Sequence, residues 1–222
     1  MGRKFDQYCP MAHALSLVGE RWSLLIAREL LQGPKRYTDL SNGLPGIGTN
    51  ILAARLRELE DCGVVQKRRL PPPAASTVYE LTEYGSGLSE ALYALARWGA
   101  RTLGPPRADD VLYPEWGVNA FPALFDAEAA RGLTETYVLE IDDDVFTARI
   151  VDGRLETTLG AADDADLTIE LDMETFFALT GGELDPREAV ESGRARIEGE
   201  VEAVERCFRV LSLAPRIGAA AA

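Results

Sequence analysis

The feature that most constrains this chain is an abrupt change of charge at a Gly-Pro-Pro segment, residues 104–106. Residues 1–103 carry 13 Lys and Arg against 10 Asp and Glu, a balance of +3, whereas residues 104–222 carry 10 against 26, a balance of −16. A glycine followed by two prolines ends a helix, and the acids that follow are solvated. We therefore expect domains at 1–103 and 115–222, joined by a linker at 104–114. Only the first domain has a charge that suits a polyanion.

The composition excludes several classes of protein. Hydrophobic residues make up 46% and charged residues 27% of the chain, which is typical of a globular protein. No apolar run reaches the roughly 18 residues that a membrane span needs. The N-terminus also lacks the apolar stretch of a signal peptide, so we expect a cytoplasmic protein without a membrane span.

Reactive and metal-binding side chains are few. His13 is the single histidine, and the three cysteines are far apart and form no Cys-x-x-Cys pair: Cys9, Cys62 and Cys207. This pattern argues against a disulfide framework, a zinc site and Ser-His-Asp catalysis. The adjacent acids Asp163 and Asp164 lie in an expected turn with no visible nucleophile and base beside them. We therefore expect no enzyme activity, no metal and no cofactor.

Residues 1–103 show the element order of a winged helix-turn-helix domain. Helices are expected after Pro10 and at 20–31, 37–44 and 49–61. Two strand-like stretches, 64–70 and 77–81, flank a tip at 71–76 and predict a hairpin. Thr82 is expected to cap a last helix that continues to about Leu103. Its apolar residues in helical register are Leu88, Leu92, Leu95 and Trp98.

The helix expected at 49–61 carries the predicted DNA-reading surface. Leu52, Leu56 and Leu59 recur every three or four residues and should face the core. The opposite face then presents Thr49, Asn50, Ala53, Ala54 and Arg57. Asparagine pairs with adenine, threonine and alanine contact the thymine methyl, and arginine reads guanine or holds a phosphate. The second helix of a helix-turn-helix enters the major groove in this way.

Basic residues flank this helix in the sequence. Lys35 and Arg36 precede the first helix of the pair, and Lys67, Arg68 and Arg69 lie on the hairpin. Both groups suit contacts with phosphates or with the minor groove. Each residue alone is explained equally well as a solvated surface charge. The ordered set of helix, tight turn, helix and basic hairpin favours binding to double-stranded DNA.

Residues 8–101 resemble the HxlR family of winged-helix regulators. The resemblance rests on Cys9-Pro10 and Gly63-Val64-Val65, and on the stretches 19–26, 33–40, 44–47, 52–60 and 79–85. It implies a homodimer built from the terminal helices, with one recognition helix for each half of an inverted-repeat operator. The expected role is that of a nucleoid-associated repressor. Tyr79 and Trp98 fall where the family places core aromatics.

Cys9 leaves an alternative open. Some HxlR-type proteins use a cysteine at this place to sense oxidants or electrophiles, and the resemblance extends this role to Cys9. Arg3, Lys4 and the start of a helix lie nearby in the sequence and favour a thiolate. The competing interpretation is that Cys9 only packs at a dimer interface. Cys62 and Cys207 lie on helical patterns and are expected to be inert.

Residues 115–222 change to a pattern of strands followed by helices. Strands are expected at 137–141, 145–151, 154–159, 165–172 and 195–200, and Asp152-Gly153 is a strong hairpin signal. Helices are expected at 173–180, 185–192 and 201–213. The predicted fold class of the whole chain is α+β.

This half resembles the sterol-carrier-protein type of lipid-binding domain. The resemblance covers about residues 130–213 and rests on 163–169, 176–182 and 189–200. It implies a helix-covered sheet around an apolar cavity that holds a hydrophobic small-molecule effector. Candidate cavity walls are aromatic, since ligand pockets are mostly apolar: Trp116, Phe121, Phe125, Phe146, Phe176 and Phe177.

Two alternatives to this ligand site remain open. One is that the six aromatics simply fill the core. The other is that the domain only supports oligomerisation. A further hypothesis is that the chain is a lipid-binding module in which the winged helix serves as a dimerisation scaffold. The basic hairpin disfavours that hypothesis.

Overall fold

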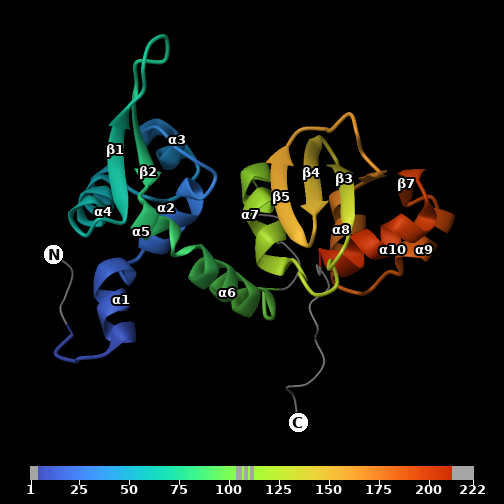
Figure 1. Ribbon diagram of the computed structural model, residues 1–222, viewed down its shortest axis with the longest axis horizontal. Coiled ribbons are helices and arrows are strands. Elements are labelled where there is room, and N and C mark those ends of the chain that lie inside the picture. Colours follow the sequence, from blue (N-terminus) through green and yellow to red (C-terminus); the bar gives the residue numbers. More distant parts are fainter. Residues whose placement is uncertain (1–4, 104–106, 108–109, 111–112, 212–222) are drawn as a thin grey trace. The chain divides into compact units, whose positions relative to one another are not determined.

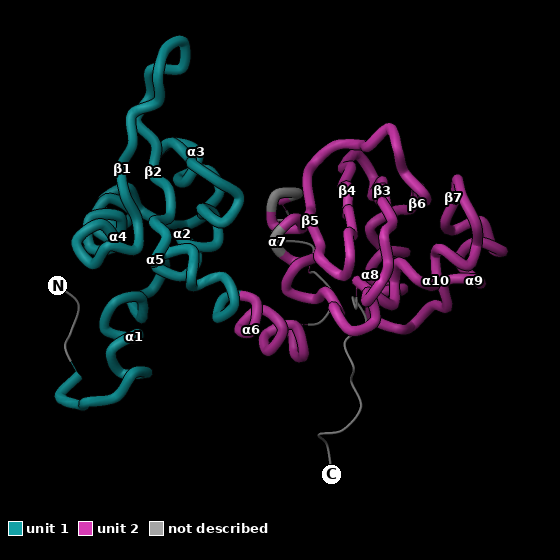
Figure 2. Tube along the Cα trace, in the orientation of Figure 1, with its two compact units in different colours: residues 1–92 teal, residues 93–222 magenta. Residues whose placement is uncertain are grey.

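The computed structural model describes residues 5–103, 107, 110 and 113–211. The chain divides into two compact units, unit 1 at residues 1–92 and unit 2 at residues 93–222 (Figures 1 and 2). Most of the expected linker at 104–114 lies outside the described residues, as do Arg3, Lys4 and the end of the helix expected at 201–213.

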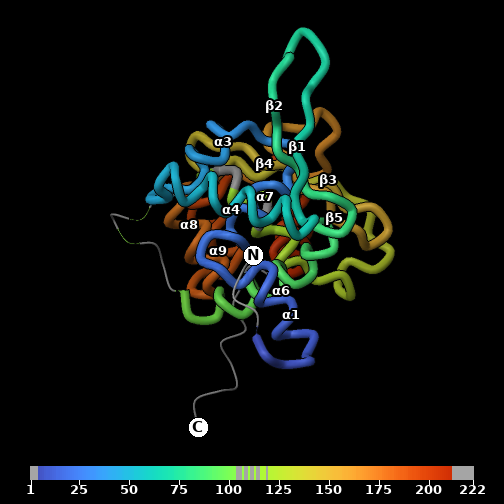
Figure 3. Tube along the Cα trace, turned by 90° about the vertical axis from the view of Figure 1, so that its left-hand side faces the viewer, coloured from blue at the N-terminus to red at the C-terminus, as the bar shows by residue number. Residues whose placement is uncertain are grey.

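Unit 1 has the winged helix-turn-helix fold that its sequence predicts. In chain order its elements are α1 (Pro10–Val18), α2 (Ser23–Leu30), α3 (Tyr37–Asn42), α4 (Thr49–Asp61), β1 (Val65–Arg69), β2 (Thr77–Leu81), α5 (Glu83–Ser86) and the start of α6 (Ser89–Ala100). Strands β1 and β2 pair antiparallel, from Val65 opposite Leu81 to Arg69 opposite Thr77. Their hairpin, here called the wing, projects from the helices of unit 1 (Figures 1 and 3).

The core of unit 1 is aliphatic and forms around the helix-turn-helix. The side chains of α4 that face inward are the predicted ones, Leu52, Leu56 and Leu59, and all three are fully buried. They pack in one cluster with Ile26 of α2 and Leu40 of α3. Gly46, in the turn between α3 and α4, has φ 85°, which a glycine adopts without steric cost.

Helix α2 is shorter than expected. It begins at Ser23 instead of residue 20, because Trp22 takes a left-handed conformation with φ 82° and occupies the N-cap position. Leu25 is exposed on the outer face of α2. The sequence therefore predicts this helix correctly but places its start three residues too early.

The last helix of the winged-helix pattern is two helices. Thr82 is a cap as predicted, and its Oγ1 accepts a hydrogen bond from the Gly85 backbone N–H at 2.9 Å. The helix that it caps, α5, ends at Ser86, and α6 follows from Ser89. Helix α6 buries none of its side chains. Trp98 is 70% exposed, so its predicted place in the core is wrong for the isolated chain.

Unit 2 is a five-stranded sheet with helices packed on it. After α7 (Pro114–Leu124), its strands are β3 (Thr134–Ile141), β4 (Asp144–Val151), β5 (Arg154–Leu159), β6 (Leu167–Leu171) and β7 (Ala195–Gly199), in the sheet order β5-β4-β3-β6-β7. Helices α8 (Met173–Thr180) and α9 (Pro186–Glu191) lie between β6 and β7, and α10 (Val201–Val210) follows. Helix α7 packs beside β5, whereas α9 and α10 lie toward β7 and β6 (Figure 1).

The hairpin predicted at Asp152-Gly153 is confirmed. Val151 pairs with Arg154 across the turn, and both turn residues have positive φ, 48° and 72°. Strands β3 and β6 are parallel, whereas the other neighbouring strands are antiparallel. All five predicted strands and the helices are present, so the chain is α+β.

Candidate nucleic-acid interface

Helix α4 presents a solvent-facing surface at its N-terminal end. Thr49, Asn50, Ala53 and Arg57 are exposed, whereas Ala54 is half-buried. The start of the helix is fixed from α3, because the Tyr37 hydroxyl donates a hydrogen bond to the Thr49 carbonyl at 2.7 Å. The polar and small side chains that suit base edges are therefore free of the core and held on an anchored helix.

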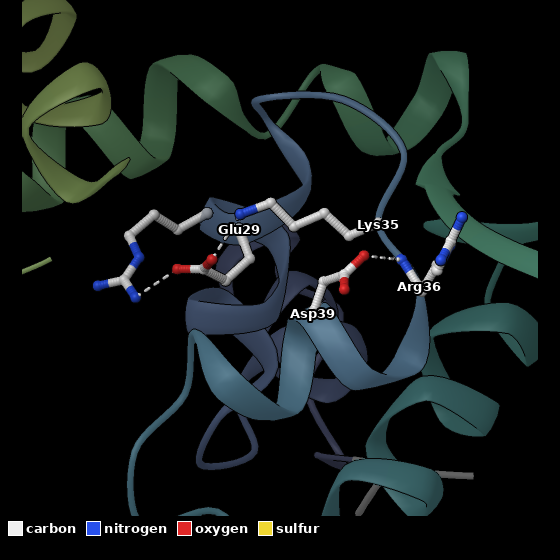
Figure 4. Close-up of polar contacts among 5 residues, drawn as sticks. Glu29, Lys35, Arg36 and Asp39 are labelled. Carbon is white, nitrogen blue, oxygen red and sulfur yellow. Dashed lines mark hydrogen bonds and ion pairs between the residues drawn. The ribbon is translucent and has the colours of Figure 1, made fainter. Parts of the chain in front are cut away.

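A buried carboxylate of α2 is paired with Lys35 and a neighbouring arginine (Figure 4). Glu29 of α2 has a side chain only 2% exposed, and its two oxygens lie 2.7 Å from Lys35 Nζ and 2.7 Å from Arg28 Nη2. Gly43 leaves room for this carboxylate, since a Cβ there would lie 2.6 Å from Glu29 Oε2. Burying an ionised carboxylate is costly unless it is paired, which these two cations achieve.

Lys35 also joins the wing. Its backbone N–H donates to the Tyr79 carbonyl at 2.9 Å, and its carbonyl accepts from the Tyr79 N–H at 2.8 Å. This bridge places Lys35 as a one-residue third strand beside β2 of the wing. Lys35 therefore ties α2, the start of α3 and the wing together, and its ammonium neutralises Glu29 instead of facing solvent alone.

Arg36, the next residue, differs from Lys35. Its backbone N–H donates to Asp39 Oδ2 at 3.0 Å and so caps α3 (Figure 4). Its guanidinium is exposed and carries no ion pair within the described residues. Of the two basic residues before α3, Arg36 is the one whose charge is available to a phosphate.

Two of the three basic residues of the wing are paired. Lys67 Nζ lies 2.8 Å from Glu60 Oε2 of α4 and 5.3 Å from the centroid of the Tyr79 ring. Arg68 holds Glu80 of β2 through Nε and Nη2, each at 2.8 Å from Oε2, and Gln66 donates to the same carboxylate at 2.9 Å. The hydrogen bonds from Arg68 and Gln66 lower the pKa of Glu80, so this carboxylate stays ionised.

Arg69 completes the wing and carries no ion pair in the described parts of the chain. It is exposed at the end of β1, next to the tip. The predicted cations of unit 1 thus form two groups of three. Lys35, Lys67 and Arg68 have carboxylate partners, whereas Arg36, Arg57 and Arg69 have none among the described residues.

Sequence reasoning identified the cations but not their partners. Glu29, Glu60 and Glu80 have no pattern of their own in the sequence, because each meets its cation only after the helices and the wing have packed. The Arg68 and Glu80 pair is the exception, since the hairpin register places Glu80 opposite Gln66, diagonal to Arg68.

The three cysteines differ in accessibility. Cys9 is exposed at the N-cap of α1, Cys62 is half-buried, and Cys207 of α10 is buried. Burial raises the pKa of the Cys207 thiol, which agrees with its expected inertness. Among the described residues no group of three or more His, Cys, Asp or Glu is placed to hold a metal ion.

The six aromatics proposed as cavity walls pack mainly against one another and the core of unit 2. Phe121 and Phe146 are buried with ring centroids 5.7 Å apart, and Phe176 and Phe177 are also 5.7 Å apart. Phe125 packs on the same core. The ring centroid of Trp116 lies 4.8 Å from that of Tyr113.

Two hollows on unit 2 are lined by other residues. One of about 650 Å³ lies between α9 and α10, beside Arg187 and Arg206. The other, of about 530 Å³, lies on β4 and β5 beside Arg149 and Asp164. None of the six aromatics lines either hollow. Four of them belong to the core of unit 2 or pack against it: Phe121, Phe125, Phe146 and Phe176.

Comparison with known proteins covers both units. Residues 17–106 match the family described as HxlR-like helix-turn-helix, and residues 119–212 match the SCP-2 sterol transfer family. The HTH-type transcriptional regulator YodB of Bacillus subtilis is 37% identical over 98 residues, which cover 44% of this chain and 88% of YodB. The HTH-type transcriptional regulator Rv3095 of Mycobacterium tuberculosis is 32% identical over 142 residues, 63% of this chain and 89% of that protein.

Two solved structures are similar to the N-terminal part. The reduced form of YodB is 34% identical and covers 46% of this chain and 100% of its own, with a TM-score of 0.39. The redox regulator HypR in its reduced form is 27% identical and covers 41% of this chain and 90% of its own, also with a TM-score of 0.39. Among the described residues, no helix has the length and apolar character that crossing a bilayer requires.

Proposed function

The chain belongs to the HxlR-like helix-turn-helix family of transcriptional regulators, and from this membership we propose that it binds an inverted-repeat operator in double-stranded DNA as a homodimeric repressor. The observation that carries the proposal is the exposed face of α4, where Thr49, Asn50, Ala53 and Arg57 project from an anchored helix. Helix α4 enters the major groove, and Arg36 and Arg69 contact phosphates on either side.

Exposed apolar side chains support the homodimer. Helix α1 exposes Met11 and Leu15, and α6 exposes Leu95 and Trp98. Apolar surface of this kind marks an interface, and these helices are the ones from which the family resemblance builds the dimer. A two-fold dimer presents two copies of α4. It is therefore expected to read a palindromic sequence whose two half-sites lie about one helical turn apart.

The test is selection of bound duplexes from a random pool by the full chain, followed by affinity measurement on the selected sequence. We expect an inverted repeat, and Asn50→Ala or Arg57→Ala to weaken binding to it by about 1–3 kcal/mol each. Selection of no preferred sequence contradicts the proposal and favours a lipid-binding module with the winged helix as scaffold. Equal affinity of both variants and the parent contradicts the assignment of α4.

Cys9 supports a second candidate, control of DNA binding by oxidants or electrophiles. Solved structures of YodB include reduced, diamide-treated and quinone-bound forms, and HypR is described as a redox regulator. Cys9 is exposed at the start of α1, one of the proposed dimer helices. Treatment with diamide or a quinone is expected to change operator affinity of the parent and not of Cys9→Ser. An equal change in both excludes Cys9 as the sensor.

Unit 2 is proposed to bind a hydrophobic effector, on the strength of its match to the SCP-2 sterol transfer family. The two hollows described on unit 2 are not lined by these aromatics, so a ligand among them enters by opening the core. Extraction of the purified protein and mass spectrometry of the extract test the proposal. A lipid-free extract, together with no thermal shift on adding fatty acids or sterols, overturns it.

A further inference from the structure

The carboxylates that pair with the wing are placed behind its cations. The side chains of Lys67 and Arg68 are 49% and 46% exposed, whereas those of their partners Glu60 and Glu80 are 23% and 16% exposed. The cations therefore face solvent and the carboxylates lie beneath them. Gln66 also holds Glu80 in place, and the Tyr79 ring lies under the Lys67 ammonium.

This placement changes what the wing offers to DNA. Sequence-independent binding comes from lysines and arginines that neutralise phosphates and release counterions. A phosphate that approaches Lys67 or Arg68 also meets a carboxylate within a few ångströms, well inside the screening length of about 8 Å at physiological salt. The repulsion between phosphate and carboxylate offsets part of the attraction. Three cations and two carboxylates give this part of the wing a net charge near +1.

We propose that Glu60 and Glu80 determine specificity by weakening the sequence-independent part of DNA binding. They neutralise two wing cations in the free protein, so that stable attachment depends on the base contacts of α4 and on the unpaired arginines. Glu60 lies on α4 itself, which places one of these carboxylates at the junction of the recognition helix and the wing. This inference rests on the proposed function, since it concerns how the same surface discriminates among duplexes.

The test compares Glu60→Gln, Glu80→Gln and the double variant with the parent on the selected operator and on a random-sequence duplex. Glutamine keeps the size and a hydrogen-bond acceptor and removes the charge. We expect each single variant to bind the random duplex roughly three- to tenfold more tightly, and the magnitude of its salt slope to rise by about 1. Operator affinity is expected to rise by a smaller factor, so the preference for the operator falls. An equal rise on both duplexes would overturn the inference, because the carboxylates would then set affinity and not specificity.

Glu83→Gln is the matched control. Glu83 is exposed on α5 and has no ion pair within the described residues, so this variant changes net charge without releasing a cation. In a second control, Glu80→Gln is combined with Arg68→Ala, and the gain from Glu80→Gln should disappear if it acts through Arg68. Circular dichroism melts establish that each variant is folded.

The possible outcomes separate the two proposals. Unchanged or weaker binding by the Glu60 and Glu80 variants overturns the inference and indicates that Glu80 orients Arg68 productively. An equal gain in Glu83→Gln also overturns it, because net charge alone is then the cause. If the parent prefers no sequence, the proposed function fails whatever the glutamate variants do. If the parent prefers an operator and the glutamate variants do not differ from it, only this inference fails.

Discussion

At the scale of single residues, the surface cations of unit 1 are not equivalent. Three arginines are exposed and have no ion-pair partner among the described residues: Arg36, Arg57 and Arg69. Lys35, in contrast, forms an ion pair with the buried carboxylate of Glu29. Counting basic residues therefore overestimates the charge that DNA meets. The unpaired arginines are therefore the residues at which we expect a substitution to change DNA binding without changing the fold.

Arg69→Ala is expected to weaken binding to all duplexes alike. The proposal assigns its guanidinium to one phosphate and to no base, so the magnitude of the salt slope should fall by about 1. Fluorescence anisotropy on operator and random duplexes over a range of salt measures both quantities. A loss confined to the operator would instead assign Arg69 to base recognition in the minor groove.

The cysteines are expected to react in the order of their exposure. Cys9 is exposed, Cys62 is half-buried, and Cys207 is buried with a raised pKa that keeps it a thiol. Iodoacetamide should modify Cys9 first in the native protein and reach Cys207 only on unfolding. Mass spectrometry of peptides after timed labelling checks this order. Modification of Cys207 as fast as Cys9 would show that α10 opens readily.

The outward residues of α4 were predictable from the sequence because the leucine spacing alone orients a helix. The pairing of the cations was not. Glu29 and Lys35 are six residues apart on either side of a Gly-Pro turn, and only the fold of that turn places the ammonium on the carboxylate. Local periodicity carries no information about such contacts.

At the scale of elements, Lys35 joins three parts of unit 1. Lys35→Ala should lower the free energy of unfolding by about 1–3 kcal/mol, because it removes one of the charged hydrogen bonds of buried Glu29. Arg36→Ala is the matched control and should change stability by less than about 0.5 kcal/mol. Urea unfolding followed by circular dichroism measures both. A stable Lys35→Ala would mean that Arg28 alone satisfies Glu29.

Helix α8 depends on its N-cap. The Asp172 carboxylate accepts a hydrogen bond from the Thr175 backbone N–H at 2.7 Å, and this bond lowers the pKa of Asp172. A carboxyl with a lowered folded pKa stabilises the fold above its unfolded pKa, near 3.9, and loses this effect as pH falls through the folded value. Asp172→Ala should therefore cost about 1 kcal/mol at neutral pH.

The pH dependence provides the control for Asp172. Once the pH falls below the unfolded pKa, near 3.9, and approaches the lowered folded value, the carboxyl takes up a proton, so the stability of Asp172→Ala should approach that of the parent. Thermal melts at pH 7 and at pH 3 compare the two proteins. A difference that stays constant between these pH values would mean that the hydrogen-bonding charge is not what stabilises α8.

Element boundaries were less predictable than element types. The expected helix from Thr82 to Leu103 is interrupted after Ser86, where Gly85 packs so closely that a Cβ would lie 2.0 Å from the Val64 carbonyl oxygen. That close approach is a tertiary contact between α5 and the start of the wing. A continuous helical pattern in sequence does not reveal it.

At the scale of the whole molecule, the proposed homodimer accounts for the exposure of Trp98. Trp98→Glu places a charge in the proposed interface and should convert the dimer to a monomer with much weaker operator binding. Leu159→Glu is a matched control, since Leu159 is also exposed but lies on β5 and not on α1 or α6. Light scattering coupled to gel filtration measures the mass. A dimeric Trp98→Glu variant would place the interface elsewhere.

The second half shows the limit of prediction from sequence at this scale. Alternation along the chain predicts each strand, but not the order β5-β4-β3-β6-β7 or the parallel pairing of β3 with β6. Strand order depends on which faces the helices cover, and this is decided by packing over the whole unit. The same holds for the aromatics, whose sequence positions do not distinguish core from cavity.

The division between partnered and unpartnered residues has a consequence for how such regulators diverge. Asn50, Ala53 and Arg57 face solvent on α4, and their side chains are not among the described ion pairs and hydrogen bonds that hold α2, α3 and the wing together. If these outward residues read the operator as proposed, duplicated genes that encode this scaffold can acquire new target promoters through substitutions at a few positions, while the folding stability of the ancestor is inherited intact.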